Sequence, residues 1–318
     1  MSAGVDEQTR ALFAEGVRKA AVDAAAVERD IALDELGWGD ALADAPEMAI
    51  PVLFAIQGET NTTSTGLDDV LAHALGVDRG SAAVLVPRSG GAAAPAIATD
   101  GRVTGHGFAR VGTDVTAVLI ATGSGVASVA LADLDVRPVH GLDPRLGLAE
   151  IRASQAGAAR TVDTLPWSAA LAAGQLALGH ELVGAARTML ALAVEHARSR
   201  VQFGRPVASF QAIRHRLAES YVEIEAATAA LAGAAEYPDA SGVPAQIAKA
   251  AAGRAALTTA RHAQQTLAGM GFTTEHSFHR YLRRARVLDA LLGSTNELTR
   301  SVGEQVLTAR SLPPMQPL

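Results

Sequence analysis

The sequence contains no cysteine among its 318 residues. Disulfide bonds, a thiolate nucleophile and cysteine-ligated zinc or iron–sulfur sites are therefore excluded. Lysine is almost absent, since it occurs only at Lys19 and Lys249. An excess of positive charge is also lacking, because 27 Lys and Arg against 33 Asp and Glu give a net charge of −6. This acidic balance disfavours a general nucleic-acid binder.

Features of exported and membrane proteins are missing as well. The N-terminal segment carries the acids Asp6, Glu7 and Glu15 and no continuous apolar core, so it does not resemble a signal peptide. The alanine-rich stretch 167–179 is interrupted by Gln175 and is shorter than the ~20 residues that span a bilayer. With 49% apolar and 19% charged residues, the composition is globular. We therefore expect a soluble, cytoplasmic protein that does not bind membranes.

Three regions differ in the spacing of their apolar residues. Residues 1–78 have helical spacing, and residues 79–163 contain short β-type runs between glycine and aspartate turns. Residues 164–318 return to helical spacing over longer segments. The predicted fold is therefore mainly α, with shortened N-terminal helices, a small middle β-barrel or sandwich and a C-terminal four-helix bundle. The expected segments are helices at 49–56, 67–75 and 245–267, a helix ending near Arg198, a helix with the stripe Phe210, Ile213, Leu217, Tyr221 and Ile224, a capped helix after Gly293, and strands at 82–86, 102–111, 115–121 and 126–130.

Two patterns that resemble cofactor or metal sites have simpler interpretations. A dinucleotide loop must be followed by a helix, but the segment after Gly123-Ser124-Gly125 alternates like a strand, which favours a β-turn. His196, His276 and His279 are too sparse for a metal site, so none is expected.

The segment 200–206 combines a cation, an amide and an aromatic ring at a turn between two helices. Arginine suits bidentate contact with a diphosphate, while Gln202 can hydrogen-bond and Phe203 can cover a ring. An ordinary helix–helix turn with a solvated Arg200 is an equally good interpretation from these residues alone.

Several motifs of the C-terminal half resemble the acyl-CoA dehydrogenase family. They occur in the family's order, and the similarity extends from about residue 150 to 310, with a weaker match over 101–135. The motifs are Arg200-x-Gln202-Phe203-Gly204-x-Pro206 followed by Phe210-Gln211, then the glycine-rich segment from Gln265 to Glu275, and finally Gly293-Ser294-Thr295-Asn296-Glu297. The family's domain order is helices, β domain and four-helix bundle, as predicted above from periodicity.

The resemblance implies an FAD enzyme that oxidises an acyl-CoA thioester to the 2,3-enoyl-CoA. In the family a carboxylate removes the α-proton, the flavin accepts a hydride, and electrons leave through an electron-transfer flavoprotein. The resemblance also implies which residues contact the cofactor. Family positions that contact the ADP part of FAD across a subunit interface are occupied by Arg200, Gln202, Phe203, Phe210 and Gln211. Two positions that line the same pocket hold Gln265 and Gly269, and two further cofactor-contacting positions hold Ser294 and Asn296.

The family's catalytic base is missing. Leu292 occupies the usual position of the base, and Gly174 the alternative position on the first bundle helix. Neither can accept a proton, so no catalytic residue is assigned. Glu275 and Asp289 are possible substitutes, although a solvated or structural carboxylate is the preferred interpretation of both.

The flavin-contacting stretch Thr-Glu-Pro…Gly-Ser-Asp of the family is also missing, because the corresponding residues 86–92 read Val-Pro-Arg-Ser-Gly-Gly-Ala. A short chain without a base resembles the non-catalytic subunit of α2β2 acyl-CoA dehydrogenases, which act on bulky substrates such as steroid side-chain CoA thioesters. The resemblance then implies a full-length partner that holds most of the acyl-CoA and whose FAD site this chain completes. Two alternatives stay open, a self-sufficient homotetramer with a relocated base and a flavin-free structural or regulatory subunit.

Overall fold

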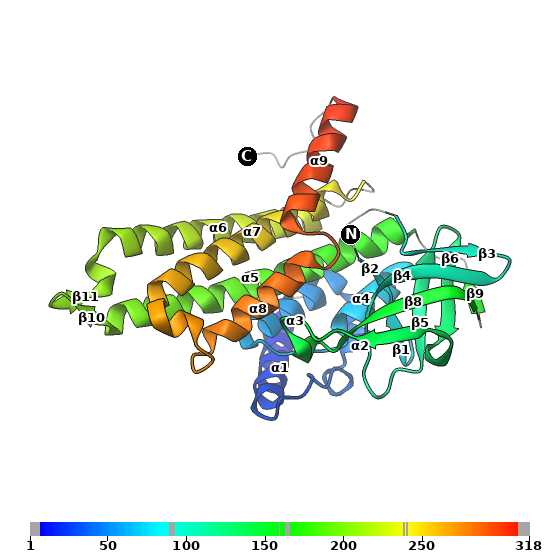
Figure 1. Cartoon of the computed structure of the whole chain (residues 1–318), viewed down its shortest axis with the longest axis horizontal. Coiled ribbons are helices and arrows are strands. Elements are labelled where there is room, and N and C mark those ends of the chain that lie inside the picture. The colour runs from blue at the N-terminus through cyan, green and yellow to red at the C-terminus, as the bar shows by residue number, and fades with distance from the viewer. Residues whose placement is uncertain are drawn as a thin grey trace.

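The computed structural model describes residues 7–88, 93–158, 160–162, 166–237, 239 and 241–310. Its elements form three groups that follow one another along the chain (Figure 1). Long helices extend to one end of the molecule, where the β10–β11 hairpin lies, and the β domain forms the opposite end (Figure 1).

The N-terminal group comprises α1 (Glu7–Ala26), α2 (Trp38–Asp44), α3 (Pro46–Thr60) and α4 (Gly66–Leu75). Its apolar side chains, among them Trp38, Leu53 and Phe54, form one buried cluster. Two glycines let α3 touch the first bundle helix: a Cβ on Gly58 would collide with the backbone of Glu181, and a Cβ on Gly184 with that of Ala55. This close approach fixes the N-terminal helices against the bundle.

The middle group is a small β sandwich. One sheet has the order β1-β5-β6-β9, in which β1 and β5 are parallel, and the other has the order β2-β4-β8-β7, with β3 paired to β4. Apolar residues of the two sheets, including Val103, Ile120 and Ile151, meet in a buried cluster. The strands are β1 (Ala82–Val84), β2 (Val86–Pro87), β3 (Ala96–Thr99), β4 (Arg102–Arg110), β5 (Ala117–Thr122), β6 (Gly125–Ala130), β7 (Asp135–Pro138), β8 (Leu148–Gly157) and β9 (Arg160–Val162).

The C-terminal group is helical. Helices α5 (Trp167–Ser199), α6 (Gln211–Glu236), α7 (Val243–Leu267) and α8 (Phe278–Ala290) pack together, and α9 (Thr295–Ala309) leaves the bundle and contacts α7. Buried alanines dominate the α5–α7 contact, and small side chains let these helices lie close together. Between α5 and α6 the chain forms the hairpin β10 (Val201–Gln202) and β11 (Arg205–Pro206).

The predicted fold class and the predicted segments agree with the structure. The capping box at Ser294 and Glu297 is confirmed, and Gly123-Ser124-Gly125 lies at the turn between β5 and β6. The prediction that Tyr221 belongs to the buried stripe of α6 is wrong, because 57% of this residue is exposed. Helices α2 and α8 and strands β3, β7, β8 and β9 were not anticipated. The boundaries at 78/79 and 163/164 stay predictions, and residues 89–92 and 163–165 lie outside the described residues.

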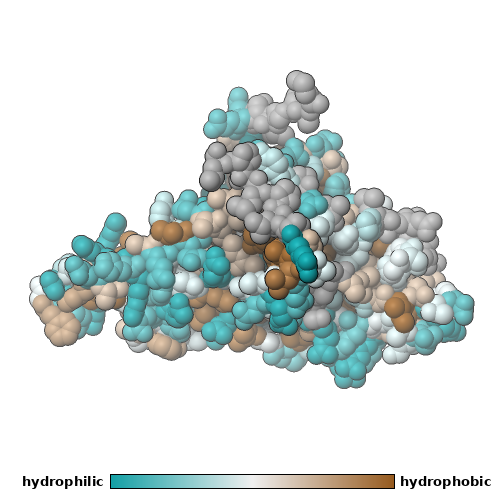
Figure 2. All heavy atoms as spheres, turned by 90° about the horizontal axis from the view of Figure 1, so that it is seen from above, coloured by the Kyte–Doolittle hydropathy of each residue, from teal (hydrophilic) through white to brown (hydrophobic). Residues whose placement is uncertain are grey.

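Helix α5 is long and apolar enough to cross a membrane by length and composition. However, 61% of its most apolar window is buried inside the protein. It packs against α3, α6, α7 and α8, as a core helix does. From above, the surface along the bundle is mixed, with hydrophilic groups between small apolar patches (Figure 2).

Candidate cofactor site

A two-residue hairpin turn presents the 200–206 segment at the end of the bundle. Phe203 and Gly204 have φ angles of +52° and +76°, and two successive positive φ angles are typical of the type I′ turn that closes tight hairpins. The turn is anchored where Val207 N–H donates to the carbonyl of Arg200 at 2.8 Å. Phe203 therefore stands at the tip, with 91% of its surface exposed.

Beside this hairpin lies an open cavity of about 680 Å³, here called the end pocket. Its walls come from the last turns of α5, the hairpin, the start of α6 and the 3-10 turn Ala268–Phe272 that follows α7. The structure thus brings five of the predicted cofactor residues into one pocket from two distant parts of the sequence. These residues are Arg200, Gln202, Phe203, Phe210 and Gly269.

Two aromatic rings, Phe203 and Phe210, and the Arg200 side chain contribute to the walls of the end pocket, and Arg205 packs behind Phe210 without lining the pocket. The rings of Phe203 and Phe210 meet edge to face with centroids 6.2 Å apart, and the Arg205 guanidinium lies 4.3 Å from the centre of the Phe210 ring. Such a wall suits a flat ring system with an attached anion.

Backbone strain is concentrated at the same pocket. Phe203 and Ala268 both line it, and both are non-glycine residues with positive φ, +52° and +50°. The ψ of −128° at Ala268 places it in a region that glycine normally occupies. Strained residues of this kind cluster at functional sites.

Four predicted cofactor residues lie outside this pocket. Gln211 and Gln265 are exposed and do not line it. The Ser294 hydroxyl is used in the capping box of α9, where it contacts the Glu297 carboxylate at 2.8 Å, and Asn296 is exposed on the first turn of that helix. Helix α9 leaves the bundle well away from the β10–β11 hairpin (Figure 1), so Ser294 and Asn296 belong to a different place.

The two family positions of the catalytic base face each other. A Cβ built on Gly174 would lie 2.6 Å from Leu292 Cδ1 and 2.9 Å from Leu71 Cδ2. Leu292 is fully buried, and its carbonyl accepts a hydrogen bond of 2.9 Å from the buried Gln175 amide. The Leu292 side chain therefore fills the space in which either base would lie.

Buried polar contacts hold the loop that carries Leu292. Lys249 donates to the carbonyl oxygens of Asp289 and Gly293, at 2.9 and 2.5 Å, and burial lowers the pKa of this lysine to about 8. The Asp289 carboxylate accepts from the N–H and hydroxyl of Thr295, at 3.1 and 2.6 Å. Asp289 is thus engaged at the start of α9, and Glu275 is exposed after the 3-10 turn.

The interior next to this loop is almost filled. The cavity bordered by Leu178, Leu288 and Leu291 has a volume of about 50 Å³, less than a tenth of the roughly 680 Å³ of the end pocket. Neither a flavin ring nor an acyl chain fits in such a space.

An ionic cluster that no sequence pattern indicated closes one side of this interior. Arg284 is fully buried and contacts the Glu181 carboxylate at 3.1 Å, the Thr62 carbonyl at 2.7 Å and the Asp143 carboxylate. Burial raises the pKa of the Glu181 carboxyl, and the Arg284 charge and the Gln57 amide counteract this. The cluster joins α3, α5, α8 and the β7–β8 connection.

A second buried carboxyl, Asp68, borders the same interior cavity. It accepts the Val84 N–H at 2.7 Å, and burial raises its pKa to about 6. Arg79 and Arg110 oppose that rise.

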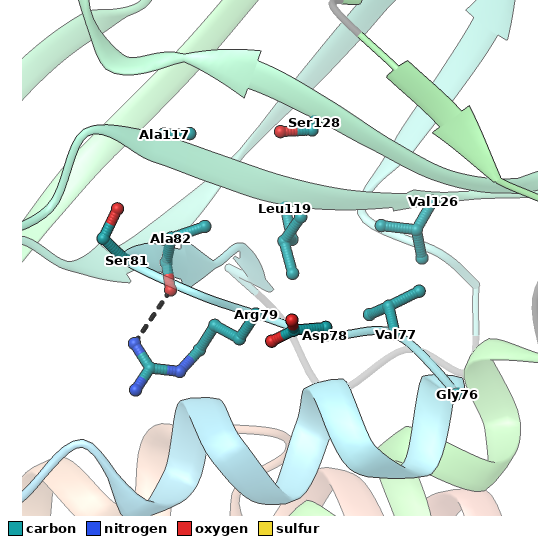
Figure 3. Close-up of a pocket in the computed structure, with 10 residues that line it drawn as sticks. All are labelled: Gly76, Val77, Asp78, Arg79, Ser81, Ala82, Ala117, Leu119, Val126 and Ser128. Atoms are coloured by element: carbon teal, nitrogen blue, oxygen red, sulfur yellow. Dashed lines mark hydrogen bonds between the residues drawn. The ribbon is translucent and has the colours of Figure 1, made fainter.

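A further cavity of about 270 Å³ lies between the loop after α4 and the first β sheet. Leu119, Val126 and Val77 line it together with the polar residues Asp78 and Ser81 (Figure 3). The Arg79 guanidinium is already bound by the Asp69 carboxylate and the Ala82 carbonyl. We assign no role to this cavity.

Within the residues that the structure describes, no group of three or more His, Asp or Glu side chains suited to a metal ion occurs. The expectation that the chain has no metal site stays a prediction.

Comparison with known proteins gives one family. The profile "Acyl-CoA dehydrogenase, C-terminal domain" matches residues 167–307. Acyl-CoA dehydrogenase IpdE2 of Mycobacterium tuberculosis is 35% identical over 196 residues, which cover 62% of this chain and 59% of that protein.

Two solved structures resemble almost the whole chain. A variant of the "Tcur3481-Tcur3483 steroid ACAD" has a TM-score of 0.83 at 22% identity, with 95% of this chain and 99% of that chain covered. The ChsE4-ChsE5 complex from Mycobacterium tuberculosis has a TM-score of 0.78 at 22% identity, with 99% and 100% covered. At these identities the likeness establishes the fold.

Proposed function

From the match of residues 167–307 to the C-terminal domain of acyl-CoA dehydrogenases and the 35% identity to one of them, we propose that this chain is the non-catalytic subunit of a heteromeric, FAD-dependent acyl-CoA dehydrogenase. In this proposal it completes the FAD site of a full-length partner and performs no proton abstraction itself.

The observation that carries the proposal is the contrast between the two halves of the site. At both family positions of the base the chain has an apolar residue or glycine, and Leu292 packs against Gly174. The adjoining cavity measures about 50 Å³, whereas the end pocket measures about 680 Å³. The chain thus has a large open pocket at its surface that can hold a ligand. Side chains fill the interior position at which proton abstraction takes place in the family.

The residues of the end pocket fit one end of FAD. Arg200 suits a diphosphate, the exposed Gln202 amide suits a polar edge, and the rings of Phe203 and Phe210 suit adenine. The interior does not fit the isoalloxazine end. FAD supplies the two-electron acceptor that α,β-dehydrogenation of an acyl-CoA needs, and this chain's residues would only bind and orient its nucleotide part.

The two locations of the predicted cofactor residues agree with this division. The end pocket opens at the tip of the molecule, where a partner can insert a cofactor. Ser294 and Asn296 follow Leu292 closely in the chain, at the base of α9, and would be remnants of the chain's own site. The proposed assembly is an α2β2 heterotetramer.

The substrate class and electron acceptor are part of the proposal. One structural relative is titled a steroid ACAD and another is a complex of two different chains. This supports a bulky acyl-CoA, such as a steroid side-chain thioester, held mainly by the partner. Electrons would pass to an electron-transfer flavoprotein.

The test uses the complex of this chain with its full-length partner. Arg200→Ala in this chain should lower the flavin content of the complex, while Arg198→Ala, an exposed arginine two residues earlier that does not line the end pocket, should not. Unchanged flavin with Arg200→Ala would favour a flavin-free structural role. Full flavin and activity in the isolated chain, lost with Glu275→Gln or Asp289→Asn, would favour the self-sufficient enzyme.

A further inference from the structure

His196 is a residue of the end pocket that the motifs did not single out for cofactor binding. It lies on the last turn of α5, four residues before Arg200, which is the extended C-cap residue of that helix, and both residues line the pocket. Its backbone carbonyl accepts the Arg200 N–H at 2.9 Å. Within the described part of the chain, its imidazole makes no hydrogen bond and is free to meet a ligand.

The groups around His196 are basic or uncharged. Arg200, which follows the end of α5, and His276, in the segment between the 3-10 turn and α8, act on it electrostatically. The parts of α6, α7 and the hairpin that line the pocket contribute no carboxylate. No ion pair of the Arg200 side chain occurs among the described residues, so the pocket has positive charge without a counter-ion.

The affinity of the pocket for an anion depends on whether the His196 imidazole is protonated. Burial, the Arg200 charge and His276 lower the pKa of His196, so it is neutral near pH 7 when the pocket is empty. A bound diphosphate offsets those charges and favours the protonated imidazole. Binding therefore takes up a proton and becomes tighter as the pH falls.

We propose that His196 is a further diphosphate-contacting residue of the end pocket, which makes this chain's hold on the partner's FAD dependent on pH. This inference rests on the proposed function, because it assumes that the nucleotide part of FAD enters the pocket. The unpaired Arg200, the unbonded imidazole beside it and the strained Phe203 and Ala268 backbones all lie on the walls of one cavity.

The test measures FAD release from the complex by the rise in flavin fluorescence at about pH 5.5 and about pH 8, on either side of the usual histidine pKa. The diphosphate of FAD keeps the same charge over this range. Release should be on the order of threefold to tenfold slower at the lower pH, since one pKa unit of linkage is a tenfold change in affinity. His196→Gln should lose this difference, and His196→Arg, permanently charged, should release slowly at both pH values.

His215→Gln is the matched control, because this histidine is exposed on α6 and does not line the pocket. It should keep the wild-type profile. An unaltered profile in His196→Gln, with Arg200→Ala still speeding release, would overturn the role of His196 and leave the proposed function intact. If Arg200→Ala also leaves release unchanged, the proposed function fails as well.

Discussion

The contact between Gly174 and Leu292 predicts that Gly174→Ala destabilises the wild-type protein but stabilises the Leu292→Ala variant. Gly174→Ala places a Cβ 2.6 Å from Leu292 Cδ1 and 2.9 Å from Leu71 Cδ2, and overpacking of this kind costs about 1–3 kcal/mol. Alanine gains about 1 kcal/mol over glycine inside a helix. The net expectation is a destabilisation of about 0–2 kcal/mol.

Removing the leucine side chain should reverse the outcome. Leu292→Ala deletes a fully buried side chain and should cost about 2–5 kcal/mol. In that background the methyl group introduced by Gly174→Ala enters the vacated space and still meets the flexible end of the Leu71 side chain at 2.9 Å, so this substitution should stabilise by up to about 1 kcal/mol. The coupling between the two sites is then about 1–3 kcal/mol, the range found for residues in contact.

Thermal unfolding of the complex at fixed concentration measures this cycle, with about 2–4 °C expected per kcal/mol for chains of this order of size. Gly303→Ala is the control, since none of the described residues lies within 4 Å of a Cβ at this position on α9, and it should stabilise equally in both backgrounds. Additive effects of Gly174→Ala and Leu292→Ala would refute the view that Leu292 occupies the position of the missing base.

Three other substitutions test separate features. Arg284→Met should destabilise the protein by about 3–5 kcal/mol in urea unfolding, because Glu181 and Asp143 are left as buried charges. Adding Glu181→Leu should recover part of this loss. An unchanged stability of Arg284→Met would contradict the role of the buried cluster. The raised pKa of Asp68, about 6, means that the folded state binds more protons than the unfolded state between about pH 4 and pH 6, so this carboxyl's contribution falls as the pH rises through that window. The melting temperature of Asp68→Asn relative to wild type should therefore increase from about pH 4.5 to about pH 7.5, and a constant difference would exclude the shift. Ala268→Gly should stabilise by about 1 kcal/mol by relieving its backbone strain, whereas a lower melting temperature would show that alanine is accommodated there without strain.

Local sequence patterns were enough to predict the main helices and strands. The regular spacing of Leu171, Leu178 and Leu182 identifies α5, and the short β-type runs identify β1, β4, β5 and β6. Helix α8 buries Phe278, Ala285 and Leu288 at helical spacing, so its apolar face was present in the sequence. Four arginines among its thirteen residues make the segment strongly polar overall, and a search for mainly apolar helices passes over it. Strand β8 alternates buried and exposed residues, but small alanines and charges make that alternation weak.

The site divides in the same way. The motifs indicated Arg200, Gln202, Phe203, Phe210 and Gly269, and the fold brings them to one pocket; that they bind a cofactor stays a prediction. The contacts that close the interior join residues far apart in the sequence, with Gln175 and Leu292 separated by 117 positions and Glu181 and Arg284 by 103. Only tertiary packing brings such residues together, so local sequence patterns cannot predict these contacts.

Flavin stoichiometry tests the central claim most directly. The chain is purified alone and together with its full-length partner, and flavin per chain is measured by visible absorbance. The account predicts flavin only in the complex, at about one flavin for every two chains, because the cavity beside Leu288 and Leu291 measures only about 50 Å³. A full complement of flavin on the isolated chain would contradict it.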